Sequence, residues 1–198
     1  MKRTFLLMLL LTGILTANAQ AKKWEHNIYL SGGLLINKTN SGSDTGLSAR
    51  IGYGLNRYFS EKFSVMAGVA LRDVTESPFS SKDGSDDDKF TFLDIPIVAQ
   101  YHMAGQGNGW VFGLGPVLSF TANNDTYNID AIPDSPLNHI DKLKNFGLGL
   151  QPSVFYQVGK FRIGAEAYVG LTNMEKKTAH TNGSHYIHDT VVTVQFHF

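Results

Sequence analysis

Polar and apolar residues alternate with a period of two in eight separate segments of this chain. Residues 161–172, for example, read FRIGAEAYVGLT: every odd position is apolar, and every even position is polar, glycine or tyrosine. Successive side chains of a β-strand point to opposite faces, whereas a helix would spread both sets around its circumference. We therefore predict eight strands over residues 27–37, 46–58, 63–72, 91–103, 110–121, 145–157, 161–172 and 186–198.

The lengths of the strands and connections narrow the fold further. The segments are about 10 to 13 residues long; tilted membrane-crossing strands need about 9 to 11 residues, and soluble strands average about 5 to 6. Short connections at 59–62, 104–109 and 158–160 alternate with long ones at 38–45, 75–90, 121–144 and 173–185. Outer-membrane barrels have short periplasmic turns and longer external loops. The predicted fold is an all-β, eight-stranded antiparallel transmembrane β-barrel with four external loops.

The composition of the two strand faces separates this prediction from a soluble barrel. A soluble sheet turns its apolar face inward and is expected to carry Lys and Glu on its outer face. Here the polar face holds mostly Gly, Ser, Gln and isolated charges, which suits a crowded lumen. A soluble periplasmic barrel that carries an apolar ligand remains the alternative. Aromatic residues also occur near strand ends, where interfacial girdles form: Tyr58, Phe59, Phe63, Tyr101, Trp110, Phe120, Tyr156, Phe161, Phe196 and Phe198.

The first nineteen residues have the organisation of a cleavable signal peptide. Lys2 and Arg3 precede an apolar run over residues 5–15, and Ala17-Asn18-Ala19 forms an A-x-A cleavage site. We predict a signal peptide at 1–19, export through the Sec pathway, and a barrel domain at 20–198. The chain has no Cys, so disulfides and a lipid-modified cysteine are excluded.

Charge and hydropathy exclude two other classes. Removing Lys2 and Arg3 from the 17 basic residues leaves fewer basic than acidic residues, of which there are also 17. A nucleic-acid-binding protein would present a strongly basic face, so nucleic acid is not an expected partner. After the signal peptide, no apolar run reaches the roughly 18 residues of a transmembrane helix.

Short motifs resemble those of a known family. Residues 92–101 read FLDIPIVAQY, residues 170–174 read GLTNM, and residues 191–198 read VVTVQFHF. The first two resemble the L-[DE]-I-P and G-L-T-N strands of the PorT-like outer-membrane β-barrel family of Bacteroidetes. The last resembles the C-terminal strand recognised by the barrel assembly machinery, with Phe196 and Phe198 as the assembly signal. The resemblance implies an outer-membrane location and this fold, and it carries over no catalytic residue and no cofactor.

Pro96, Pro116 and Pro152 lie in the middle of predicted strands. Proline cannot donate to a β-ladder, so these residues count against an uninterrupted barrel. A bulge or local irregularity is expected at Pro96.

Five charged residues are predicted to point into the lumen. An eight-stranded barrel has an interior that side chains can fill, and buried charges must be paired. We expect a structural network, with a proton path or a small binding site as the alternative, and with Arg50, Arg72 and Asp94 at a similar depth in the outer half. The five residues are Arg50, Arg72, Asp94, Arg162 and Glu166.

Clusters near the predicted loops suggest chemistry that the patterns do not specify. The acidic run Asp83, Asp86, Asp87 and Asp88 lacks the ligand spacing of a calcium loop, and a solvated loop is the favoured interpretation. His180, His185 and His188 do not follow a zinc-site pattern. Ile129, Ile132, Leu137 and Ile140 in the third loop are expected to cap the barrel mouth. A rim enzyme would draw on His139, Asp141, Ser184, His185, His188 and Asp189.

The sequence thus predicts a non-enzymatic outer-membrane barrel without a cofactor or a wide pore. Its role is expected to be structural, adhesive or partner-binding. The expected partners are outer-membrane lipids, the barrel assembly machinery, and a protein met by the loops or in the periplasm. A lipid-modifying hydrolase or acyltransferase with a rim site is the alternative of another class.

Overall fold

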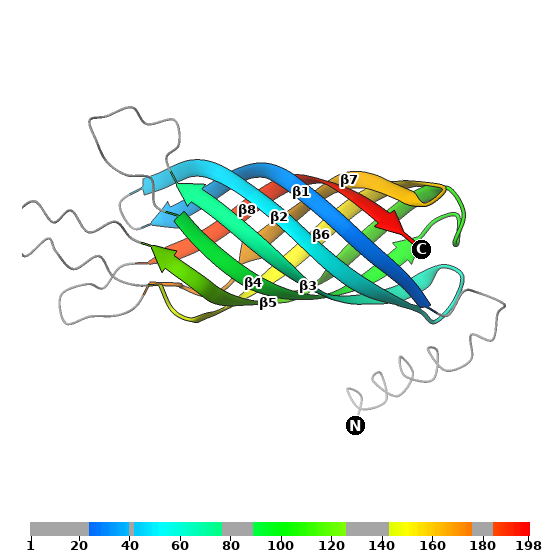
Figure 1. Cartoon of the computed structure of the whole chain (residues 1–198), viewed down its shortest axis with the longest axis horizontal. Coiled ribbons are helices and arrows are strands. Elements are labelled where there is room, and N and C mark those ends of the chain that lie inside the picture. Colours follow the sequence, from blue (N-terminus) through cyan, green and yellow to red (C-terminus); the bar gives the residue numbers. More distant parts are fainter. Residues whose placement is uncertain (1–23, 40–41, 77–88, 126–142, 176–183) are drawn as a thin grey trace, which may run out of the picture.

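The computed structural model describes residues 24–39, 42–76, 89–125, 143–175 and 184–198. Eight antiparallel strands, each paired with its neighbours in sequence, close into one barrel when β1 pairs with β8 (Figure 1). The strands are β1 (Trp24–Thr39), β2 (Gly42–Tyr58), β3 (Phe63–Glu76), β4 (Lys89–His102), β5 (Gly109–Asp125), β6 (Phe146–Val158), β7 (Phe161–Gly170) and β8 (His185–His197). The predicted fold class is confirmed.

Two ends of the barrel can be distinguished by the chain segments that join the strands. The turn end holds the short connections at 59–62, 103–108 and 159–160. The loop end is the opposite one, where β1, β3, β5 and β7 finish. No helix among the described residues has the length and apolar composition needed to cross a membrane.

Several strands extend further toward the loop end than the alternation predicts. β1 and β2 stay paired as far as Thr39 and Gly42, so the long connection predicted at 38–45 is incorrect and only residues 40–41 join these strands. β3 likewise continues to Glu76. The outward residues of the first two extensions, Lys38, Ser43 and Thr45, are polar. They lie beyond the apolar band of the wall, where a side chain does not need to be apolar. Polar and apolar residues therefore no longer alternate in these extensions, although the backbones of the strands remain paired.

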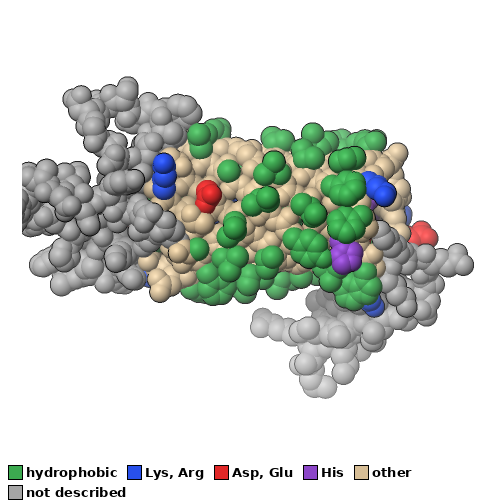
Figure 2. Space-filling view, viewed as in Figure 1, with side chains coloured by type: hydrophobic (Ala, Val, Ile, Leu, Met, Phe, Trp, Pro, Cys, Tyr) green, Lys and Arg blue, Asp and Glu red, His purple; other side chains and the backbone are tan. Residues whose placement is uncertain are grey.

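The apolar faces of the strands form the outer wall of the barrel. Leu30 is 63% exposed, and green hydrophobic side chains cover the wall between the two ends (Figure 2). Arg72, by contrast, is 1% exposed and lies inside. A water-soluble barrel would have the opposite arrangement, so the soluble carrier considered above is incorrect.

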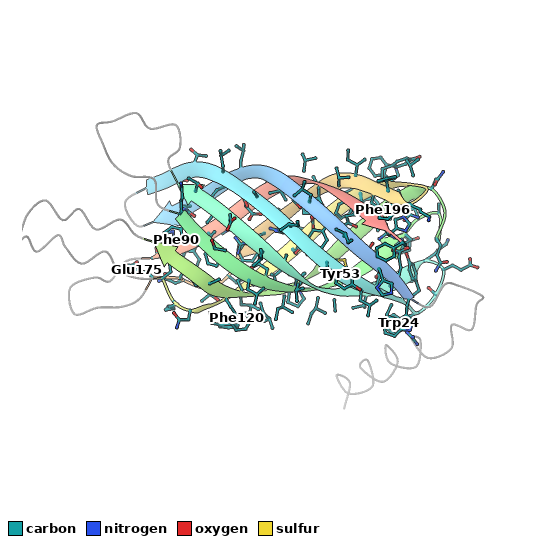
Figure 3. All side chains as sticks on the ribbon, in the orientation of Figure 1. Trp24, Tyr53, Phe90, Phe120, Glu175 and Phe196 are labelled. Carbon is teal, nitrogen blue, oxygen red and sulfur yellow. The ribbon has the colours of Figure 1, made fainter. Side chains whose placement is uncertain are left out.

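The outward aromatic residues concentrate at the turn end. Phe63 packs on Tyr101, and Phe161 packs on Phe196, with ring centroids 5.0 and 5.2 Å apart. Trp24, Tyr53 and Phe196 lie toward this end in Figure 3, and Phe90 and Glu175 lie toward the other. Tyr58 was expected in the girdle but points into the lumen, because the parity of β2 places it on the same face as Asn56.

Each of the three mid-strand prolines lies at an interruption of one ladder, with the register unchanged. The pairs beside Pro96 are missing between β3 and β4, those beside Pro116 between β4 and β5, and those beside Pro152 between β6 and β7. On its other side each proline remains paired. The missing N–H therefore affects one ladder per proline. The register of β4 and β5 shifts elsewhere, between Thr91 and Phe92, where β5 has one extra residue, Ala122.

Candidate functional site

Among the described residues, charged side chains gather in the lumen, where they form two clusters. The Arg72 cluster lies toward the loop end and comprises Ser48, Arg50, Arg72, Asp94, Ser119, Tyr168 and Asp189. The Arg162 cluster lies toward the turn end and comprises Glu25, Asn27, Tyr58, Gln157, Arg162 and His197. All five charged residues predicted for the lumen are buried.

Arg72 is the centre of the first cluster. Its Nε lies 2.6 Å from Asp94 Oδ2 and its Nη2 lies 3.3 Å from Asp94 Oδ1, so the carboxylate is held by a two-point fork. Its Nη1 lies 3.4 Å from Asp189 Oδ2. The guanidinium carbon also lies over the rings of Phe92 and Tyr168, 4.6 and 4.1 Å from their centroids. Together these ion pairs and ring contacts hold the guanidinium in place.

Arg50 and Arg72 face each other directly in the register of β2 and β3. Two like charges in such a pair repel, and the carboxylates offset this repulsion. Arg50 Nη2 lies 3.1 Å from Asp189 Oδ1, while Ser119 Oγ donates to Asp94 Oδ1 at 2.6 Å. The cluster therefore contains two guanidinium groups and two carboxylates.

The second cluster joins the first strand to the last two. Arg162 Nη2 lies 2.7 Å from Glu25 Oε1, and His197 Nδ1 lies 2.9 Å from Glu25 Oε2. Tyr58 and Gln157 complete the surroundings of the guanidinium, at 3.0 and 2.8 Å. Glu25 is thus the partner of Arg162, a role that the sequence analysis missed.

Glu166 lies between the two clusters and differs from the other buried acids. The described partners of its carboxylate are Gln151 Nε2 and, at 2.5 Å, Thr193 Oγ1, and both are uncharged. Thr193 Oγ1 also lies 2.8 Å from Ser31 Oγ. The ion pairing expected for Glu166 is therefore replaced by neutral hydrogen bonds.

An apolar plug closes the lumen on the loop side of the Arg72 cluster. Its side chains are all less than a tenth exposed and come from four strands and from the segments that flank β6 and β8. They are Leu35, Val74, Phe90, Phe92, Leu143, Met174 and Ile187. Phe92 belongs to the plug and also stacks on Arg72, so the plug lies directly against the ionic cluster.

Tyrosine side chains occupy further space in the lumen by lying against glycines. A Cβ added to Gly52 would lie 2.3 Å from Tyr29 Cζ, and one added to Gly149 would lie 2.2 Å from Tyr168 Cε2. Only glycine leaves room for a ring at such a distance. The interior consequently contains packed side chains and ion pairs along its length, which argues against an open channel of large diameter.

Two of the residues considered for a rim enzyme, His188 and Asp189, are not brought together. Asp189 and His188 are neighbours in β8, so they point to opposite faces of the wall. Asp189 is 1% exposed and neutralises Arg50 and Arg72 inside the barrel. Its assignment to the outer rim is therefore incorrect. His139 and Asp141 lie outside the described residues.

The other loop clusters also fall largely outside the described chain. The acidic run at 83–88, His180 and the apolar residues of the third loop belong to segments that the structure does not describe. Within the described ranges, no group of three or more His, Cys, Asp or Glu side chains could hold a metal ion.

A buried ionic core inside a wall of outward apolar strands defines a transmembrane β-barrel. Residues 5–176 match the family model described as "Outer membrane protein beta-barrel domain", which spans most of the chain. The chain therefore belongs to this family of outer-membrane proteins, and its location is the bacterial outer membrane.

Solved structures of low sequence identity are similar to this chain. Neisserial surface protein A (NspA) has a TM-score of 0.54 and 17% identity, over 90% of this chain and 99% of that chain. OprG from Pseudomonas aeruginosa has a TM-score of 0.43 and 14% identity, over 87% and 95% of the two chains. Ail, the attachment invasion locus protein of Yersinia pestis, has a TM-score of 0.48 and 9% identity, over 89% and 100%. No curated protein sequence matches this chain.

Proposed function

We propose that this protein is a closed, non-enzymatic barrel that acts through its loop end, as a structural, adhesive or partner-binding element of the outer membrane. The observation that carries the proposal is the filled lumen. The Arg72 cluster, the Arg162 cluster and the apolar plug occupy successive levels of the interior. Transport of large solutes would require all three to separate, which would leave buried charges unpaired.

Conductance measurement tests the closed lumen. We expect the purified full chain, inserted into a planar lipid bilayer, to show no stable stepwise current. The matched variant Phe92→Ala/Phe90→Ala removes two rings of the plug and should admit water without disturbing the Arg162 cluster. Regular, long-lived conductance steps from the unaltered protein would overturn the proposal.

A role in contact with partners at the loop end requires that this end face outward. The extended strands at this end and the short connections at the other support that orientation. Protease treatment of intact cells should cut within residues 82–89, and the connection at 103–108 should be cut only after the outer membrane is opened. Cleavage in the reverse order would refute the orientation.

Two finer assignments belong to the proposal. The PorT-like subfamily is supported by the LDIP motif, whose Asp94 holds Arg72 in the lumen. Recognition by the barrel assembly machinery is supported by the outward rings of Phe196 and Phe198 at the turn end. We expect Phe198→Ala to reduce the amount of folded barrel in the membrane, while Phe146→Ala, an outward ring on another strand, should not.

A further inference from the structure

A patch of hydrogen-bond donors lies on the outer wall where β8, β1 and β2 meet at the loop end. Lys38 faces Tyr186 of β8 on one side and Ser43 of β2 on the other. One row nearer the middle of the barrel, Ile36 faces His188 and Thr45 in the same way. We call Lys38, Ser43, Thr45, Tyr186 and His188 the donor patch.

Strand parity makes all five side chains of the donor patch point outward. They alternate with the inward residues of the same strands, among which Asn37, Ile187 and Asp189 are buried. Neighbouring side chains on one face of an antiparallel pair lie about 5 Å apart, and diagonal ones about 7 to 8 Å apart. The ammonium of Lys38, the phenol of Tyr186 and the imidazole of His188 can therefore meet on one small group.

The donor patch borders the apolar wall. The next outward residues toward the turn end on β1 and β2 are Leu34 and Leu47, and they are exposed like Ile36. Lysine and tyrosine extend their polar ends from an apolar surface toward the headgroup layer of a membrane. The patch therefore lies at the level of lipid headgroups, with acyl chains beside it.

The charge of the donor patch is one-sided. Among the described outward side chains of β8, β1 and β2 at this end, none carries a carboxylate. Glu175 lies in the segment that follows β7, where it forms a bridge with Leu143 and makes contacts of its own. The outward Asp73 is on β3 in the row of Gly32 and Ala49, six residues along β1 from Lys38, which is about 20 Å of strand.

We propose that Lys38, Tyr186 and His188 bind the phosphate of a phosphorylated membrane lipid, of which lipid A is the outer-leaflet example. An ammonium, a hydroxyl and an imidazole N–H are donors that a phosphate oxygen accepts, and the bond from the ammonium is charge-assisted. The apolar rows below the patch select a lipid over a free anion. The site is independent of whether the lumen conducts.

Native mass spectrometry of the full chain, released from neutral detergent with added monophosphoryl lipid A, measures this binding. We expect Lys38→Ser to weaken retention of the lipid about tenfold, since a charge-assisted bond is lost. Tyr186→Phe should weaken it less. Lys160→Ser, at the exposed turn between β6 and β7, is the matched control and should leave binding unchanged.

Three further measurements keep the proposal falsifiable. Heat-modifiable gel migration must show that each variant is folded; if Lys38→Ser is not, Lys38→Gln takes its place. A glycolipid without phosphate should be retained no better by the unaltered protein than by Lys38→Ser. Equal retention of monophosphoryl lipid A by both proteins, or its full displacement by an equal concentration of inorganic phosphate, would overturn the assignment.

Discussion

Removal of the Arg72 guanidinium should destabilise the barrel more than any change at its surface. Arg72→Met keeps a long side chain that can still pack between Phe92 and Tyr168. It leaves the carboxylates of Asp94 and Asp189 with Arg50 as the one remaining guanidinium of the cluster. Breaking a buried ion pair by removing one partner costs about 3 to 5 kcal/mol, and we expect a loss of that size in the free energy of unfolding.

A second substitution isolates the charge from the packing. The double variant Arg72→Met/Asp94→Leu keeps the pair of Arg50 with Asp189, 3.1 Å apart. The cluster then holds one guanidinium and one carboxylate, so its charges balance again. The double variant should recover most of the stability lost in Arg72→Met. Asp94→Ala alone should lower the temperature at which the folded band disappears on a gel, because Arg72 then lacks its closest carboxylate.

Urea unfolding in phospholipid vesicles measures these differences as shifts in the transition midpoint at constant slope. Lys160→Met, on an exposed turn, is the control and should stay within about 0.5 kcal/mol of the unaltered protein. A midpoint for Arg72→Met equal to that of the control would refute the structural role of the Arg72 cluster. A double variant as unstable as the sum of its single variants would refute the charge-balance argument.

Three further changes should separate packing from charge at other levels of the lumen. Glu166→Gln should leave stability unchanged or raise it, because the carboxylate it replaces has neutral partners; a fall in the free energy of unfolding of more than about 1 kcal/mol would contradict this. Gly52→Val should lower the free energy of unfolding by several kcal/mol, because its Cβ overlaps the ring of Tyr29, while Gly32→Val, with open space around its Cβ, should have little effect. Phe92→Ala should cost about 3 to 5 kcal/mol and speed hydrogen exchange of the neighbouring strand amides.

The faces of the strands could be predicted from the sequence because hydrocarbon imposes a strict requirement on every second residue. Wherever a strand crosses the apolar band, as at 161–170 in β7, hydropathy reveals its parity. Beyond the apolar band, outward residues no longer need to be apolar, so the alternation in hydropathy no longer reveals which face a residue is on. Asp189 was placed at the rim because its outward neighbours, His188 and Thr190, are polar; extending the parity of Val191 by one step would have placed it inside.

The pairing of the buried charges could not be predicted in the same way. Parity shows that Arg162 points inward, but its partner depends on the stagger between strands that are distant in sequence. Glu25 and Arg162 meet because β1 is paired with β8 in one register, in which Asn27 is opposite His197. A shift of two residues would keep every face correct and change every partner.

The link between Glu25 and the last two strands affects the order in which the barrel forms. Two partners of the Glu25 carboxylate, Arg162 and His197, come from the last two strands, so this carboxylate stays hydrated until those strands reach β1. Contacts between such distant residues slow folding. The contacts of Glu25 therefore form only when β1 and β8 pair, and this part of the interior stays incomplete until the ring closes.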